Sequence, residues 1–147
     1  MPTESDQTPS FTQHLDGSQA WRVNGAYHRA DGPAIIWPSG AQSWYWHGQM
    51  HRDDGPAYIT SESTEKWYQH GKLHRTDGPA IVFGDGRFAW YLDDVQMTEK
   101  EFRAWRNAQD RQAGFNVAAR VQKTDHAVIA PATARFRRMP AVPQPYS

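Results

Sequence analysis

Four tryptophans recur along this chain at a constant interval. Trp21, Trp44, Trp67 and Trp90 lie 23 residues apart, with no insertion or deletion between them. A fixed period of this size is typical of arrays of small structural units, in which each unit buries its apolar side chains only against its neighbours. The spacing constrains the architecture more than any other feature of the sequence, and it predicts a stacked array.

Two further elements of the repeat keep the same step. A histidine follows each of the first three tryptophans, and then an Asp-Gly-Pro-Ala block; these are His28, His51 and His74, with Asp31, Asp54 and Asp77. Residues present in every unit are expected to be structural. We therefore expect the tryptophans to form the stacked core. We expect each aspartate to accept backbone N–H groups in its Asp-Gly turn, and each histidine to bond the same loop or that carboxylate.

Turn signals divide each unit into short strands. One set is Asn24-Gly25, His47-Gly48 and His70-Gly71, and the other is Asp16-Gly17, Ser39-Gly40, Glu62-Ser63 and Asp85-Gly86. The stretches between them are rich in β-branched and aromatic residues. This pattern predicts a mainly β fold, an antiparallel meander of stacked 23-residue β-hairpin repeats with two main strands per unit. The segment after the first turn, such as 48–55, is either a loop or a short third strand.

Strand alternation predicts that both faces of the sheet are apolar. Ala34 and Ile36 share one face, while Ile35 and Trp37 share the other. An open sheet with one wet face would alternate apolar and polar residues. The second face is therefore expected to be covered by the C-terminal segment, by curvature of the sheet, or by a partner.

The fourth unit departs from the repeat and leads into a predicted helix. Asp93-Asp94 replaces the Asn-Gly turn, and Met97 stands where histidine is expected. Thr98 and Glu101 form a capping-box pattern, which predicts a helix over 98–112 that packs on the array through Phe102 and Trp105. Gly114 interrupts this pattern, and the sequence leaves open a second stretch of helix over 115–121. Such a helix would close the open end of the array.

Charge and composition divide the chain into segments. Residues 1–97 hold seven Lys/Arg against twelve Asp/Glu, and residues 98–147 hold nine against four. We interpret 1–10 as a flexible arm, 11–97 as the repeat array, 98–122 as the capping-helix region and 123–147 as a mobile, basic, proline-rich tail. No apolar run is long enough to span a membrane, the first residues do not resemble a signal peptide, and cysteine is absent, which together predict a cytoplasmic protein.

The repeat resembles the MORN-type β-hairpin repeats, which share its step, an aromatic residue before an Asn-Gly turn, and a histidine shortly after that turn. The block from His28 to Ala34, repeated at 51–57 and 74–80, is similar to repeats in uncharacterised proteins of tailed phages and giant viruses. The resemblance covers roughly residues 11–97. It implies a narrow, curved antiparallel sheet with a binding or scaffolding role, in host cytoplasm if the chain is phage-encoded, and it implies no enzymatic activity.

Aromatic residues outside the tryptophan ladder are the candidate partner-binding residues. The first group, Tyr45, Tyr68 and Tyr91, directly follows the repeat tryptophans and should form a row on the opposite face. The second group varies between units: Trp37, Trp46, Tyr58 and Phe83. Neighbouring acids at Glu62, Glu65 and Asp93 would favour a basic protein partner. The alternative is that this row is core beneath the C-terminal segment.

We therefore expect a non-enzymatic protein-binding module without a cofactor, which in a phage would bind and inhibit a host defence protein. Two other classes stay open: a virion or assembly component, and a metal-binding protein or metal-dependent enzyme using a His/Asp pair. Stacked units place equivalent residues about 10 Å apart, too far to share one metal ion, so no metal site is expected. The basic cluster at 135–138 makes nucleic-acid binding a weaker possibility.

Overall fold

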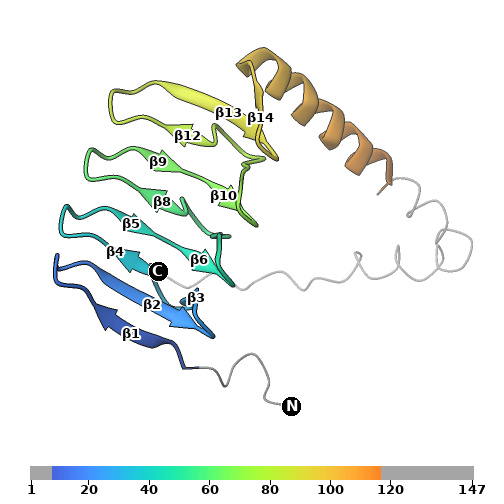
Figure 1. Ribbon diagram of the computed structural model, residues 1–147. Helices are drawn as coiled ribbons and strands as arrows, with labels where there is room; N and C mark the ends of the chain where they lie inside the picture. The colour runs from blue at the N-terminus through green and yellow to red at the C-terminus, as the bar shows by residue number, and fades with distance from the viewer. Residues whose placement is uncertain (1–7, 117–147) are drawn as a thin grey trace, which may run out of the picture. The chain divides into compact units, whose positions relative to one another are not determined.

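The computed structural model describes residues 8–116 and contains a ladder of short antiparallel strands followed by a helix (Figure 1). The chain divides into two compact units, Met1–Ala104 and Trp105–Ser147. The predicted tail over 123–147, most of the predicted arm and residues 117–122 lie outside the described residues. The expected mainly β class and the antiparallel meander are confirmed.

The main sheet is a meander in which each strand pairs with its neighbours in the chain, apart from hairpin excursions. Its strands are β1 (Ser10–Gln13), β2 (Gln19–Val23), β4 (Ile35–Ile36), β5 (Gln42–Ser43), β8 (Tyr58–Ile59), β9 (Glu65–Lys66), β12 (Ile81–Val82) and β13 (Phe88–Leu92). The array begins at Ser10, because β1 occupies the position that β4 occupies in the next unit and pairs with β2.

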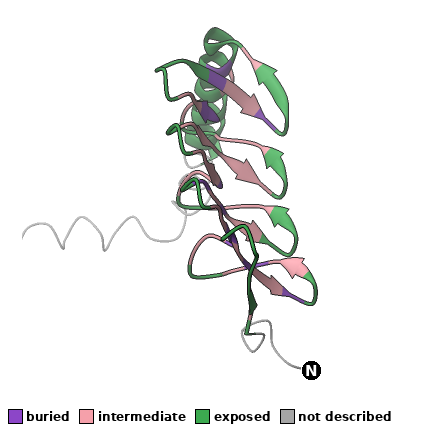
Figure 2. Cartoon of the chain, turned by 60° about the vertical axis from the view of Figure 1, so that its left-hand side comes forward, coloured by how far each residue is buried: buried purple, intermediate pink, exposed green. Residues whose placement is uncertain are grey.

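Each unit also contains a short hairpin that extends the tryptophan-bearing strand, so the segment after the first turn is a third strand. These hairpin strands are β3 (Ala26–Tyr27), β6 (Tyr45–Trp46), β7 (Gln49–Met50), β10 (Tyr68–Gln69), β11 (Lys72–Leu73) and β14 (Val95–Met97). Successive hairpins are joined by backbone bonds, since Gly48 N–H donates to the Tyr27 carbonyl and Gly71 N–H donates to the Met50 carbonyl. The return strands after β3 are largely exposed (Figure 2).

The hairpin turns have the left-handed backbone that their sequences predict. Asn24 and Gly25 have φ of 51° and 82°, the pattern of a type I′ turn. Asp93 and Asp94 take the same conformation, with φ of 49° and 67°. The expectation that the fourth unit breaks the repeat at this turn is therefore wrong: aspartate tolerates positive φ well enough to replace Asn-Gly.

Tryptophan and alanine alternate in one row across the sheet. The backbone N–H of each tryptophan donates to the carbonyl of an alanine on the neighbouring strand, with N···O distances of 2.7–2.8 Å. The pairs are Trp21 with Ala34, Trp44 with Ala57, and Trp67 with Ala80. The three alanines are completely buried. The repeat tryptophans are only half-buried, so they are not the fully buried core that the sequence suggested; the fully buried positions beside them hold alanine.

The helix begins at Glu99 and has the predicted N-terminal cap. Thr98 N–H and Thr98 Oγ1–H both donate to Glu101 Oε2 at 2.8 Å, and Glu101 N–H donates to Thr98 Oγ1 at 3.2 Å. Phe102 is 3% exposed. Helix continues to residue 116 through Gly114, so the expected interruption there is wrong; the cost of one glycine, about 1 kcal/mol, is too small to end a capped helix. Packing through Trp105 stays a prediction.

The second turn of each unit generates a stability prediction. Ser63 has φ of 62° in the slot that Gly17, Gly40 and Gly86 occupy in the other units. Because a left-handed conformation strains a residue with a side chain, Ser63→Gly should raise the free energy of unfolding by about 0.5–1 kcal/mol. Gly40→Ala should lower it by about 1 kcal/mol through backbone strain, since an added Cβ there would meet no atom within 4 Å. Urea unfolding measures both, and a loss of stability in Ser63→Gly would contradict the strain.

Candidate functional site

An arginine lies over each of the first three repeat tryptophans. The Arg29, Arg52 and Arg75 guanidinium carbons are 3.9, 4.2 and 4.0 Å from the Trp21, Trp44 and Trp67 ring centroids. A cation over an indole ring is attracted by the ring quadrupole, by about 0.5–1 kcal/mol at exposed sites. The arginine of each His-Arg-x-Asp block therefore covers the outer surface of the tryptophan row, a role that our sequence reasoning missed.

The repeat aspartates hold these arginines in place. Arg29, Arg52 and Arg75 donate through Nε to Asp31, Asp54 and Asp77 at 2.7–2.8 Å. The main partner of each carboxylate is therefore an arginine side chain, whereas the sequence suggested backbone N–H groups of the turn. That arrangement occurs in the other turn, where Asp16 accepts Ser18 N–H and Asp85 accepts Arg87 N–H.

The Gly-Pro part of the block completes this arginine clamp. Arg29, Arg52 and Arg75 donate through Nη1 to the carbonyls of Pro33, Pro56 and Pro79 at 3.2–3.3 Å. A Cβ added at Gly55 would lie 3.0 Å from Arg52 Cζ, and the equivalent glycines are almost as close. Each residue type in Arg-x-Asp-Gly-Pro therefore serves one purpose, which is to seat a guanidinium over a tryptophan.

The repeat histidines connect one unit to the next. His28 Nδ1 accepts His47 N–H at 3.1 Å, and His51 Nδ1 accepts His70 N–H at 3.0 Å. His74 Nδ1 lies 3.2 Å from Asp93 N and 3.0 Å from Asp93 Oδ1. Each histidine therefore satisfies the first N–H of the next unit's hairpin turn, a bond between units that the sequence did not predict. A contact within the same loop is also present at His51, whose Nε2 lies 3.2 Å from Asp53 Oδ1. Among residues 8–116, no group of three or more His, Cys, Asp or Glu side chains could hold a metal ion.

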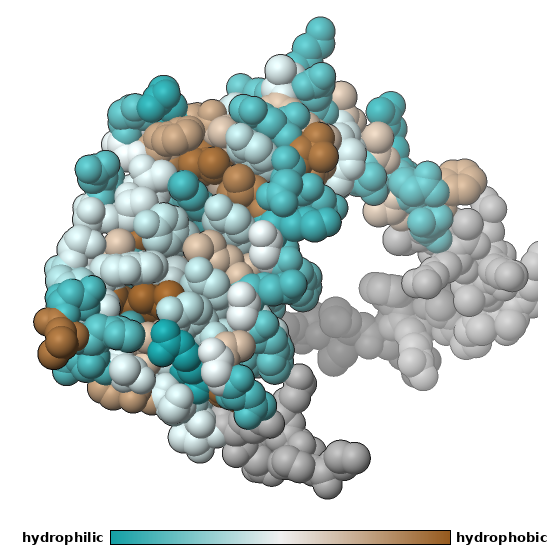
Figure 3. Space-filling model, viewed as in Figure 1, coloured by the Kyte–Doolittle hydropathy of each residue, from teal (hydrophilic) through white to brown (hydrophobic). Residues whose placement is uncertain are grey.

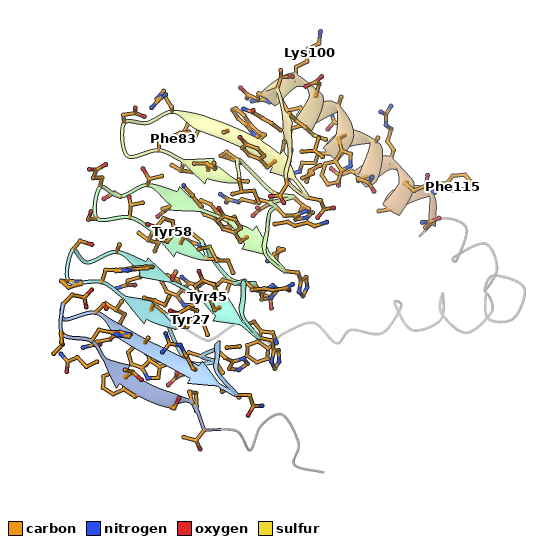
Figure 4. The ribbon with its side chains drawn as sticks, in the orientation of Figure 1. Tyr27, Tyr45, Tyr58, Phe83, Lys100 and Phe115 are labelled. Atoms are coloured by element: carbon orange, nitrogen blue, oxygen red, sulfur yellow. The ribbon has the colours of Figure 1, made fainter. Side chains whose placement is uncertain are left out.

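The predicted tyrosine row lies on one face of the sheet, which we call the tyrosine face. Cross-strand pairs and alternation place these side chains there: Ala20, Arg22, Tyr27, Ile35, Trp37, Ser43, Tyr45, Tyr58, Lys66, Tyr68, Ile81, Phe83, Ala89 and Tyr91. Six of the seven predicted partner-binding residues are therefore brought together. Tyr27, Tyr45, Tyr58 and Phe83 follow one another along the stacked strands (Figure 4).

Aromatic rings on the tyrosine face lie over small buried residues. Ser43 is completely buried and Ala20 is 2% exposed, whereas Tyr45 and Tyr58 are half-buried. The Tyr27 and Tyr45 ring centroids are 5.3 Å apart, and those of Trp37 and Tyr58 are 5.9 Å apart with the rings edge to face. The rings thus cover part of the second apolar face within the array itself, and part of their own surface stays accessible.

Burial affects the ionisation of two of these tyrosines. It raises the pKa of Tyr45 and of Tyr68 above its ordinary value near 10, and for Tyr68 the nearby Asp94 carboxylate adds to the effect. The phenols therefore stay neutral, with hydroxyl groups available as hydrogen-bond donors.

Trp46 lies on the opposite face, which carries the repeat tryptophans and which we call the tryptophan face. It pairs with Gln49, is 38% exposed, and packs against His28 with ring centroids 4.2 Å apart. Sequence variation alone grouped Trp46 with the other variable aromatic residues. Trp46 lies two residues after Trp44, and residues two apart in a strand share a face. This spacing is the sequence signal that separates Trp46 from the other variable aromatic residues.

The tryptophan face also has two equivalent hollows between successive arginine clamps. The first is lined by Asp31, Pro33, Trp44, His51, Arg52 and Asp54, and the second by Asp54, Pro56, Trp67, His74, Arg75 and Asp77. Each member of the second set lies 23 residues after its counterpart in the first. The hollows are therefore a product of the repeat, formed by residues whose bonds maintain the array.

Comparisons of the chain with protein-family models, with curated proteins and with solved structures gave no match. Within residues 8–116, no helix has the length and apolar character needed to cross a bilayer.

The histidine bonds between units predict a selective loss of stability. His51→Leu removes the acceptor of His70 N–H and the contact of Nε2 with Asp53, and should lower the free energy of unfolding by about 0.5–1.5 kcal/mol. His51→Asn places an amide oxygen near the position of Nδ1 and should lose less. Urea unfolding of both variants tests this prediction. Equal losses of unfolding free energy in the two variants would show that the His51 ring stabilises the array by packing and not through this hydrogen bond.

The aspartates of the arginine clamps predict how stability depends on pH. Hydrogen bonds and charge from Arg29 and Arg52 hold the pKa of Asp31 and of Asp54 below its ordinary value of 3.8. A carboxyl group with a depressed folded-state pKa contributes stability that is present above its unfolded pKa and is lost as pH falls through the folded pKa. Melting temperature should therefore fall as the pH drops below the ordinary carboxyl pKa of 3.8.

The matched variant for this pH dependence is the pair Asp31→Asn and Asp54→Asn in one chain. Since amides do not titrate, this variant should be less stable at neutral pH, with a shallower fall in melting temperature on acidification. Differential scanning calorimetry provides the measurement. An unchanged slope would mean that other carboxyl groups cause the acid unfolding.

Proposed function

We propose that this chain is a non-enzymatic protein-binding module and that the tyrosine face is its contact surface. The observation that carries the proposal is that six of the seven predicted partner-binding aromatic residues lie together on this face. Each of the six is half-buried in the array. Tyrosine suits such a surface because it offers apolar area, a hydrogen-bonding tip and little rotamer freedom to lose. The side chains that a catalytic site would need are already engaged: the histidines join adjacent units, and the arginines and aspartates form the clamps over the tryptophans.

The surface hydropathy supports contact through aromatic rings rather than through an aliphatic patch. Seen in the direction of Figure 1, strongly hydrophobic residues form separate spots within a pale and teal surface (Figure 3). Protein interfaces are rich in tyrosine and tryptophan at their energetic centres. A narrower version of the proposal is that a phage-encoded chain of this kind binds and inhibits a host defence protein in the host cytoplasm, which rests on the resemblance of the repeat.

Two other functions are weaker. A virion or assembly component is compatible with a stacked array, and self-association of the purified chain would favour it. A metal-dependent activity based on a His/Asp pair would need histidines that the array already uses between its units.

The test of the proposal is substitution on the two faces. Tyr45→Ala and Tyr68→Ala should each weaken capture of a host protein from lysate by at least about tenfold if these residues are hot spots. Trp46→Ala removes an exposed aromatic residue from the tryptophan face and is the matched control, with capture unchanged. Binding is measured well below the melting temperature of each variant.

If both tyrosine variants melt several degrees lower but capture the same protein with unchanged affinity, the row is core and the proposed contact surface is wrong. Stoichiometric metal in native mass spectrometry of the purified chain would instead favour the metal-dependent class.

A further inference from the structure

The centre of the tyrosine face departs from the repeat. At two of the unit junctions the cross-strand pair on this face is apolar or small, Ile35 with Ser43 and Ile81 with Ala89. At the middle junction the same pair is Tyr58 with Lys66. The array therefore folds with aliphatic and small residues in these slots, and the middle junction replaces them with an aromatic residue and a cation.

Lys66 has no carboxylate to neutralise it within residues 8–116. Its ammonium lies 5.6 Å from the Tyr58 ring centroid, and no ion pair within 4 Å joins it to an acid. The residues in its slot at the other junctions, Ser43 and Ala89, are buried, and Lys66 itself is half-buried. Apart from the contact with the Tyr58 ring, no interaction with an opposite charge offsets the partial burial of this cation.

Within residues 8–116, a second cation without an ion pair to a carboxylate lies in the first unit. Arg22 takes the slot of Tyr45, Tyr68 and Tyr91, donates to the Tyr27 hydroxyl at 2.8 Å, and lies 4.4 Å from the Tyr27 ring centroid. Arg87, also on this face, lies over Phe83 but is paired with Asp85 at 2.7 Å.

The acids expected around the tyrosines lie elsewhere. Glu65 pairs with Ile59 and Val82, which puts it on the tryptophan face. Glu62 and Asp93 lie in turns at the ends of the strands. None of the described strand positions of the tyrosine face is an aspartate or glutamate, although Asp94 in a hairpin turn is close enough to influence Tyr68.

We propose that the tyrosine face recognises an acidic segment of its protein partner, with Lys66 and Arg22 contacting carboxylates and the neighbouring rings contacting apolar side chains between them. This rests on the proposed function and reverses the charge that the sequence suggested for the partner. Charge complementarity of this kind sets which partners bind and how fast they associate.

A protein segment fits the observations better than a nucleic acid. Residues 8–97 hold seven Lys/Arg against ten Asp/Glu, so a densely charged polyanion would be repelled, whereas a few carboxylates aimed at two cations would not. In addition, a cation lies against the Tyr27, Tyr58 and Phe83 rings, which leaves less of each ring free for a stacked base.

The experiment is selection of short random peptides against the full chain, followed by affinity measurements on variants. Peptides enriched on the wild-type chain should carry Asp or Glu beside aromatic or aliphatic residues. Lys66→Ala installs the residue found at Ala20 and Ala89; it should keep or raise the melting temperature and weaken the selected peptides by about tenfold. Lys66→Glu should enrich basic peptides instead.

Lys72→Glu is the matched control, because Lys72 is exposed and pairs with Gln69 on the tryptophan face. It should leave both the selection and the affinities unchanged. Peptides without an acidic bias, or equal effects of Lys66→Glu and Lys72→Glu, would overturn the inference. Tighter binding of a single-stranded oligothymidine than of the selected peptides would overturn it in favour of nucleic acid.

The two proposals fail in different ways. If selected peptides lose affinity in Tyr45→Ala and Tyr68→Ala but not in Lys66→Ala, the tyrosine face is a contact surface and only the acidic partner is wrong. If the tyrosine variants bind the peptides as well as the wild-type chain does, the contact surface itself is wrong.

Discussion

The arginine over each of the first three repeat tryptophans is the interaction on which the rest of the array depends. A unit of 23 residues has too little apolar surface to bury alone, and the fully buried positions next to the tryptophans hold only alanine. The indole rings cover those alanines from outside, and the arginines in turn cover the rings. Each guanidinium is fixed by one carboxylate and one proline carbonyl. The block that looks catalytic in the sequence therefore substitutes for the second layer that most sheets require.

The architecture was predictable because periodicity, turn chemistry and strand alternation all carry positional information. The constant tryptophan step gave the stacking, Asn24-Gly25 gave a type I′ turn, and Thr98 with Glu101 gave the start of the helix. The bonding partners inside the repeat were less predictable, because a histidine that bonds its own loop and one that bonds the next unit have the same spacing. Choosing between them requires the distance between adjacent strands, which no single unit encodes.

The candidate surface was predictable in part. Alternation separates Tyr45 from Trp44, so the row of tyrosines and its face followed from sequence position alone. The charge around the row did not, because Glu65 and Lys66 are adjacent in sequence and the face of each depends on register. A shift of one residue exchanges the two faces, and with them the sign of the charge that a partner would meet. The equivalent positions at the other junctions hold Ser43 and Ala89, and only this comparison shows that a cation at position 66 departs from the repeat.

The histidine bonds between units have a consequence for how such a chain can change in length. Each bond joins a histidine to the N–H that lies 19 residues further along, in the turn of the following unit. Loss or duplication of a complete 23-residue segment leaves every such separation intact, since a turn of the same conformation arrives opposite each ring. Gain or loss of any other number of residues separates a ring from its turn and inverts or displaces the faces beyond that point. Recombination that adds or removes whole 23-residue units can therefore change the number of units in the array. The structure of each unit and its contacts with its neighbours stay the same.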